Sequence, residues 1–142
     1  MNMNRHAASF RELIVHQKAR SVAKEIFAVS QRFPRDEIYA LTDQVRRSSR
    51  SVGAQIAEAW GKRRYEKHFV SKLTDADGEQ YETQHWVDSA LDCGYLTREQ
   101  ADHLNDELSQ VGRMLNGMIE KSASFCGEMP LVVKEDSIEY FT

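Results

Sequence analysis

The sequence has few of the residues that punctuate β-rich folds. Its 142 residues include only 7 Gly and 2 Pro, and both Pro34 and Pro130 lie outside the long periodic stretches. Tight turns between short strands depend on Gly and Pro, so their scarcity argues against a sandwich or a barrel and favours helices. A chain of this length with 41% apolar residues is expected to form one domain around a single core.

Cysteine and long apolar runs are also scarce. The two cysteines, Cys93 and Cys126, form no CxxC pair. A chain of this size can build its own core, so its fold is not expected to depend on the one disulfide that they could form. We therefore expect both thiols to be reduced and mostly packed. Residues 1–10 contain no apolar run typical of a signal peptide, and no stretch approaches the roughly 20 apolar residues of a membrane span. These absences predict a cytoplasmic protein with no membrane partner.

Motifs for catalysis and for cofactors are missing as well. There is no glycine-rich phosphate loop, and no serine or cysteine has a recognisable general base. One metal-like pattern occurs, Glu79-x-x-Glu82-x-x-His85, but di-iron bundles need a Glu-x-x-His motif on each of two helices. An ion pair or a solvated face explains the pattern better than a metal site. We predict neither an enzyme nor a bound metal or cofactor.

The sequence does contain four stretches with helical periodicity. In the first, between residues 7 and 32, apolar residues recur every three or four positions and therefore share one face. The members of this stripe are Val15, Ala19, Val22, Ile26, Val29 and Phe33, and Phe10, Ile14, Ala23 and Phe27 widen it. The second stripe should start at an N-cap, Asp36, and end near Trp60 and Gly61.

The third and fourth stretches have clear boundaries. The third should begin between residues 64 and 66 and end at Gly94, which can adopt the left-handed C-terminal cap conformation. The fourth should begin with a capping box formed by Thr97 and Gln100 and fray near residues 124–127. Because the connections are short, the helices must run up and down beside one another. We predict an all-α, up-and-down antiparallel four-helix bundle over residues 1–127, followed by a C-terminal tail, residues 128–142, that docks on a groove or stays loose.

Charge is distributed unevenly along the chain. Residues 1–72 hold 15 Lys and Arg against 7 Asp and Glu, whereas residues 73–142 hold 4 against 15. In one explanation, the first two helices pack beside the last two and the opposite charges compensate. In the other, a basic surface on the first pair binds an anionic polymer.

The cations of the second helix and its exit are the candidates for such a surface. They are Arg46, Arg47, Arg50, Lys62, Arg63, Arg64 and Lys67, and they lie among Trp60, Tyr65 and Phe69. Cations beside aromatic rings suit RNA, since cations neutralise phosphates and rings stack on unpaired bases. In the alternative, the arginines pair with acids of the third helix, such as Asp75, Glu79 and Glu82, and Trp60 closes the end of the bundle.

Small residues occupy the outer side of the same helix. With Val45, Val52 and Ile56 facing inward, Gly53 and Ala57 fall on a flank and Ala54 lies nearly opposite the core. Small side chains let another backbone approach closely, which indicates an interface between copies of the chain. Simple tolerance of alanine at a solvated face is the alternative.

The second and third helices resemble a known family, the 23S rRNA intervening-sequence proteins. The matching residues are Gln44-Val-Arg-Arg47, Ser51-Val52, Gln55-Ile-Ala-Glu58, Trp60-Gly61, Lys62-Arg63, Phe69, Leu73, Ala76, Gly78, Glu82, Ala90 and Gly94-Tyr-Leu96. The similarity extends from Val15 to Ile119. Three residues depart from the family pattern: Gln55 replaces Asn, Ala59 replaces Gly and Glu79 replaces Ser.

The resemblance implies a four-helix bundle that assembles as a ring-like homopentamer. Relatives include the accessory protein of diversity-generating retroelements, which works with RNA and a reverse transcriptase. Within the pattern, Gln44, Ser51, Glu58 and Glu82 are expected to serve structure. The leading hypothesis is a non-enzymatic homo-oligomer that binds RNA or a nucleic-acid-associated protein through the basic residues above. The alternative is a structural adaptor that binds a protein partner and has no role with nucleic acid.

Overall fold

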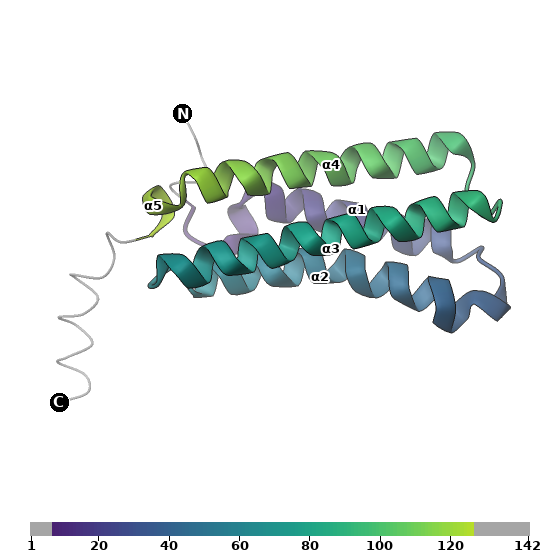
Figure 1. Cartoon of the computed structure of the whole chain (residues 1–142), viewed down its shortest axis with the longest axis horizontal. Helices are drawn as coiled ribbons and strands as arrows, with labels where there is room; N and C mark the ends of the chain where they lie inside the picture. Colours follow the sequence, from purple (N-terminus) through teal and green to yellow (C-terminus); the bar gives the residue numbers. More distant parts are fainter. Residues whose placement is uncertain (1–6, 127–142) are drawn as a thin grey trace.

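A computed structural model describes residues 7–126, and its main elements are four long helices (Figure 1). They are α1 (Ile14–Ser30), α2 (Asp43–Gly61), α3 (Glu66–Asp92) and α4 (Arg98–Glu120). The shorter elements are η2 (Phe10–Glu12), η3 (Arg35–Glu37), the π-helical η4 (Ile38–Thr42) and α5 (Ser122–Phe125). None of residues 7–126 forms a strand, so the prediction of an all-α fold is confirmed. The predicted tail, residues 128–142, lies outside the described range.

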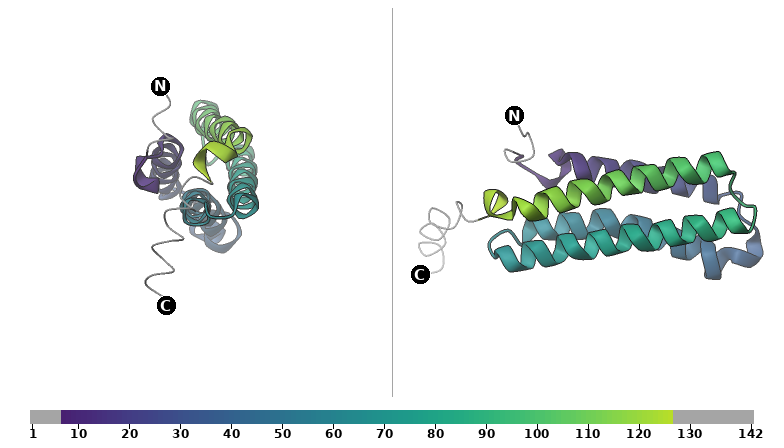
Figure 2. Two further views of the ribbon diagram at one scale, coloured as in Figure 1. Left: turned by 90° about the vertical axis from the view of Figure 1, so that its left-hand side faces the viewer. Right: turned by 45° about the horizontal axis from the view of Figure 1, so that its top comes forward.

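The four long helices run alternately up and down and enclose one core. Seen from the end, they lie at the corners of a square (Figure 2). α1 packs against α2 and α4, and α3 packs against the same two helices on the other side. The predicted antiparallel bundle is therefore the observed architecture.

The start of α1 and the link to α2 differ from the predictions. A capping box between Ser9 and Glu12 caps the start of η2. Leu13, which follows η2, is extended, so α1 begins only at Ile14. Asp36 is not an N-cap, because it lies inside η3. The chain then continues through η4 into α2 without a side-chain cap.

The predicted end of α3 at Gly94 and the predicted start of α4 at Thr97 are confirmed. Gly94 has a φ of 78°, and the N–H groups of Gly94 and Tyr95 donate to the carbonyls of Leu91 and Ala90 in a Schellman motif. At the start of α4, the Gln100 N–H donates to Thr97 Oγ1 at 3.0 Å, and the Thr97 N–H donates to Gln100 Oε1 at 2.9 Å. These two motifs set the sharp turn between α3 and α4.

The two cysteines are free, but only Cys126 is packed as expected. Its thiol lies in the core beside Phe125, and burial raises its pKa. Cys93 is exposed because it occupies the C-cap of α3, where the helix turns away from the core.

The core consists of two apolar clusters with a polar layer between them. One cluster surrounds Phe69 and Leu115, and the other surrounds Ile26 and Leu104. In the layer, the hydroxyls of Ser48 and Thr83 share a hydrogen bond of 2.8 Å across α2 and α3. Each hydroxyl also bonds a carbonyl of its own helix, Ser48 that of Val45 and Thr83 that of Glu79, and the bond between the two hydroxyls favours one alignment of α2 and α3.

Gln80 completes the polar layer and depends on a glycine of α4. Its side chain is 1% exposed; its amide donates to Asp77 at 3.0 Å and its oxygen accepts from Gln84 at 2.8 Å. A Cβ placed on Gly112 would lie 2.8 Å from Gln80 Nε2 and 3.2 Å from Asp77 Oδ1. The missing side chain of Gly112 therefore provides the space for the buried amide.

The substitution Gly112→Ala should lower the free energy of unfolding by about 1–2 kcal/mol, because the new methyl group displaces Gln80 from its hydrogen bonds. Gly117→Ala is the matched control in the same helix, since a Cβ there meets nothing within 4 Å. The control should gain about 0.5–1 kcal/mol from the better helix propensity of alanine. Urea unfolding followed by circular dichroism measures both, and equal effects of the two substitutions would contradict this role for Gly112.

Candidate functional site

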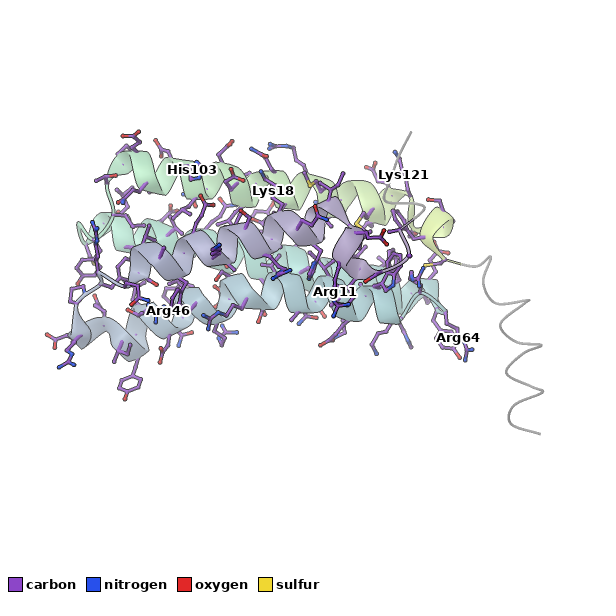
Figure 3. All side chains as sticks on the ribbon, turned by 180° about the vertical axis from the view of Figure 1, so that it is seen from behind. Arg11, Lys18, Arg46, Arg64, His103 and Lys121 are labelled. Carbon is purple, nitrogen blue, oxygen red and sulfur yellow. The ribbon has the colours of Figure 1, made fainter. Side chains whose placement is uncertain are left out.

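The structure sorts the seven predicted nucleic-acid-binding cations into three settings. Arg47 lies on the side of α2 that faces α3, Arg46 and Arg50 lie on the side that faces α1, and the remaining four lie at or beyond the end of α2. Figure 3 shows α1 and α2 side by side, with Arg46 towards one end of the bundle and Arg64 at the other. The predicted residues therefore do not form one compact site.

Arg47 is held by acids of α3, as the ion-pair alternative predicts. Its Nη2 atom donates to Glu82 Oε2 at 2.7 Å, and its Nη1 atom lies 4.0 Å from Glu79. Glu82 also accepts a hydrogen bond from Trp86 Nε1 at 3.0 Å. Burial and the neighbouring Glu82 raise the pKa of Glu79, and Arg47 opposes this effect. Arg47 thus joins α2 to α3 and is not available as a free cation.

A second polar contact joins the same two helices. Lys72 of α3 forms a salt bridge with Glu58 at 2.8 Å and donates to Gln55 Oε1 at 3.3 Å. The hydrogen bond lowers the pKa of Glu58 and raises that of Lys72. Gln55 stands where the family pattern has Asn, and its amide still contacts the neighbouring helix. Of the other pattern residues, Gln44 donates to the Tyr39 carbonyl at 3.4 Å, and Ser51 is half-buried on α2.

On the opposite flank of α2, a groove separates α2 from α1. We call it the α1–α2 groove; its apolar lining is Ala19, Ala23, Phe27, Ala54 and Ala57, and its charged lining is Arg20, Lys24 and Arg50. The groove encloses about 430 Å³. Phe27, expected to face the core, is 40% exposed, and the guanidinium carbons of Arg46 and Arg50 lie 4.7 and 5.5 Å from its ring centroid.

The cations around the α1–α2 groove have no acidic partner. Among the residues that the structure describes, no carboxylate forms a salt bridge with Arg20, Lys24, Arg46 or Arg50. Arg46 instead donates from Nε to Ser30 Oγ at 2.8 Å. Sequence reasoning missed Arg20 and Lys24, although their spacing of four places them on one side of α1, next to Phe27.

The wall of the groove contains a buried histidine. His16 is 6% exposed, and Phe10 packs edge-on against its ring at a centroid distance of 4.8 Å. Burial, with the nearby Arg20 and Arg11, lowers the pKa of His16 and favours the neutral ring. Its Nδ1 atom has no hydrogen-bond partner among residues 7–126. A Cβ on Gly53 would lie 3.8 Å from His16 Nε2, so the buried Gly53 is a point of close contact between α1 and α2.

The third group of cations lies at the end of the bundle. Arg63 stacks on Trp60 with its guanidinium carbon 3.5 Å from the ring centroid, and its Nε atom donates to the Trp60 carbonyl at 2.9 Å. Burial lowers the pKa of Arg63. Trp60 itself packs on the apolar cluster around Phe69. Arg63 therefore covers the tryptophan and closes this end of the core.

The neighbours of Arg63 are exposed and form what we call the bundle-end cluster. It consists of Lys62, Arg64, Tyr65, Lys67 and His68. Tyr65 is 59% exposed, with its ring centroid 5.4 Å from that of His68. In the described part of the chain, no carboxylate forms a salt bridge with Arg64 or Lys67. Cations and aromatic rings are thus presented together to solvent.

Residues 7–126 contain no group of three or more His, Cys, Asp and Glu side chains placed to hold a metal ion. In the Glu79, Glu82 and His85 pattern, Glu82 is engaged by Arg47 and Trp86. No helix in the described range is long and apolar enough to cross a membrane.

The chain is similar to a known protein family and to a solved structure. The model of the family "23S rRNA-intervening sequence protein" matches residues 11–117. A crystal structure of a protein with unknown function from the S23 ribosomal protein family of Bacteroides thetaiotaomicron is similar, with a TM-score of 0.68 and 27% identity. The similarity covers 75% of this chain and 98% of that chain. None of the curated proteins compared matches the sequence.

The assignment of Arg47 to structure can be tested with a double-mutant cycle. Arg47→Gln, Glu82→Gln and the double variant should give a coupling energy of about 0.5–1 kcal/mol, modest because the Arg47 side chain is 54% exposed. Arg64→Gln, which removes a cation with no acidic partner in the described part of the chain, should change the free energy of unfolding by less than about 0.5 kcal/mol. Urea unfolding measures all four variants, and a coupling energy of zero would contradict the assignment.

Proposed function

The chain belongs to the 23S rRNA-intervening sequence protein family, and on that premise we propose that it is a non-enzymatic homo-oligomer that binds RNA. The observation that carries the proposal is the bundle-end cluster. There, Arg64 and Lys67 lie beside the exposed ring of Tyr65, and no carboxylate of residues 7–126 forms a salt bridge with either of them. The structure changes the expected set of contacts, because Arg47 is engaged by Glu82 and Arg63 by Trp60.

The chemistry of the bundle-end cluster favours single-stranded RNA or a loop. Lysine and arginine displace counterions from phosphates, which provides affinity without sequence preference. An exposed tyrosine can stack on a base that is free of a duplex, and RNA recognition mostly targets such unpaired bases. Arg46 and Arg50, about 18–24 Å farther along α2 at 1.5 Å per residue, add a second positively charged stretch for a longer strand.

Self-association is the second part of the proposal. Ala54 is exposed on the crest of α2, between the α1–α2 groove and a shallow depression lined by Gln44, Arg47 and Ser51. Ala57 is half-buried at the edge of the groove. An exposed helix crest with small side chains permits close approach of a second backbone. Because Gly53 contacts His16 within the chain, the proposed contact between copies centres on Ala54, and the family resemblance leads us to expect five copies.

RNA binding can be measured by fluorescence anisotropy with a labelled single strand and a labelled stem-loop. The variant K62Q/R64Q/K67Q should weaken binding of the single strand at least tenfold, equivalent to about 1.4 kcal/mol. It should also flatten the dependence of log K on log salt by about 0.7 for each phosphate that the variant no longer neutralises.

The matched control is R32Q/R35Q/R98Q, which removes three exposed cations from the opposite end of the bundle. This variant should bind like the unaltered chain. Equal losses in both variants would show only a general charge effect and contradict a site at the bundle end. No binding at all would reject RNA as the ligand and favour the adaptor alternative.

The oligomer can be tested by light scattering coupled to size exclusion. The chain should elute as a multiple of its 16.4 kDa mass, fivefold if it forms the ring of its family. Ala54→Glu should lower the mass by placing a charge in the contact, whereas Ala28→Glu, at an exposed alanine of α1, should not. A monomeric chain, or an unchanged mass for Ala54→Glu, would contradict the proposed interface.

A further inference from the structure

We propose that the α1–α2 groove is the docking site of residues 135–142 of the same chain. This segment reads Glu-Asp-Ser-Ile-Glu-Tyr-Phe-Thr. Its acids would face the cations of the groove, and Ile138, Tyr140 or Phe141 would cover the apolar floor.

The groove first requires a negatively charged occupant. Arg20, Lys24 and Arg50 line it, and Arg46 adjoins it over the ring of Phe27. No carboxylate of residues 7–126 forms a salt bridge with any of the four. Like charges gathered at one place repel one another, and the repulsion is relieved when an anion is supplied from outside the described part of the chain.

The groove also requires an apolar occupant. Its floor consists of alanine side chains and Phe27, which is 40% exposed. An inorganic anion or a strongly solvated phosphate would leave this floor in water. The volume of about 430 Å³ lies within the range of small ligand sites, about 300–1,000 Å³, and suits a few side chains. The fitting ligand therefore combines carboxylates with large apolar groups.

The histidine in the wall of the groove has a polar atom that is unsatisfied within residues 7–126. His16 is more than nine-tenths buried and lines the groove, yet its Nδ1 atom has no partner in the described range. A buried polar atom without a hydrogen bond is costly. The Nδ1 atom is itself covered by the chain, so the case for the segment rests on the cations and the apolar floor of the groove.

Residues 135–142 have the required composition. They contain three acids, Glu135, Asp136 and Glu139, no lysine or arginine, and three large apolar residues. The acids and apolar residues alternate closely enough that a short peptide presents both kinds to one surface. In contrast, the acids of α3 and α4 are fixed on their helices and serve other contacts, such as those of Glu82 with Arg47 and Glu107 with Lys18.

The segment is long enough to reach the groove. Cys126, the last described residue, lies at the end of the bundle near Arg63 and Glu66, whose charges affect the pKa of its thiol. Along α2, Arg50 lies about 17 Å from Gly61 at 1.5 Å per residue. Residues 127–137 span up to about 35 Å when extended, twice that length. Tethering also raises the local concentration of the segment to the millimolar range, which favours it over a free peptide.

Docking would regulate the proposed function, and this consequence alone rests on RNA binding. The segment would cover Arg50 and compete with phosphates for Arg46, and it would leave the bundle-end cluster free. Replacing its acids should therefore strengthen RNA binding several-fold at low salt, while the docking itself needs no RNA.

The docking can be tested on the full chain by placing the photo-crosslinking residue p-benzoylphenylalanine at position 141. Irradiation followed by mass spectrometry should give crosslinks to groove residues of α1, such as Ala19, Ala23 and Phe27. Both K24E/R50E and the milder K24Q/R50Q should reduce these crosslinks to background, whereas R32E/R98E, which alters two exposed cations outside the groove, should not. Circular dichroism confirms that each variant is folded.

A mixture of light and isotope-labelled chains shows whether the segment docks on its own chain. Crosslinks that pair light with light and heavy with heavy support the proposal, while mixed pairs would overturn it in favour of a second copy. Crosslinks to α3 or α4, no crosslinks, or crosslinks unchanged in the groove variants would also overturn it. Because no RNA is present, a failure here is distinct from a failure of the RNA proposal.

Discussion

The hydrogen bond between Ser48 and Thr83 is the contact on which the alignment of the bundle depends. Apolar side chains pack in several registers with similar energy, whereas the hydroxyls of Ser48 and Thr83, which also bond carbonyls of their own helices, meet each other in only one register. A shift of α3 by one turn would separate them and would also move Gln80 away from the space beside Gly112. The polar layer therefore selects one register of α2, α3 and α4 from those that the apolar stripes allow.

That register decides which charges are neutralised. With Ser48 opposite Thr83, Arg47 meets Glu82, and farther along the two helices Glu58 meets Lys72. A third set of contacts joins α1 to α4, where His103 bonds to Glu25 at 2.8 Å, and this bond raises the pKa of His103. Compensation between helices therefore explains only part of the uneven charge. Opposite charges compensate between neighbouring helices, and the cations left over gather at the α1–α2 groove and the bundle end.

Local signals in the sequence were sufficient to predict the four helices, but they did not show which cations lie together on the surface. The Thr97 capping box and the Gly94 cap depend on residues close in sequence, so they were predicted correctly. The π-helical turn before α2, η4, was not predicted, because its buried residues are placed by tertiary packing. On sequence grounds, Arg46, Arg47 and Arg50 were grouped in one basic surface, and only the neighbouring helices reveal that Arg47 faces acids whereas Arg50 faces an open groove. Arg20 looked like an ordinary solvated charge, because α2 lies beside it only in the folded chain.

The concave shape of the α1–α2 groove itself follows from small residues. A Cβ on Gly53 would lie in ordinary contact with His16, at 3.8 Å from Nε2, and Ala19, Ala23, Ala54 and Ala57 leave the seam between α1 and α2 unfilled. The opposite seam of α2 is filled by long side chains, among them Gln55 and Lys72. Ala54 and Ala57, which suggested an interface on sequence grounds, also line this groove, and the cations around it, which have no acidic partner among residues 7–126, favour an acidic occupant.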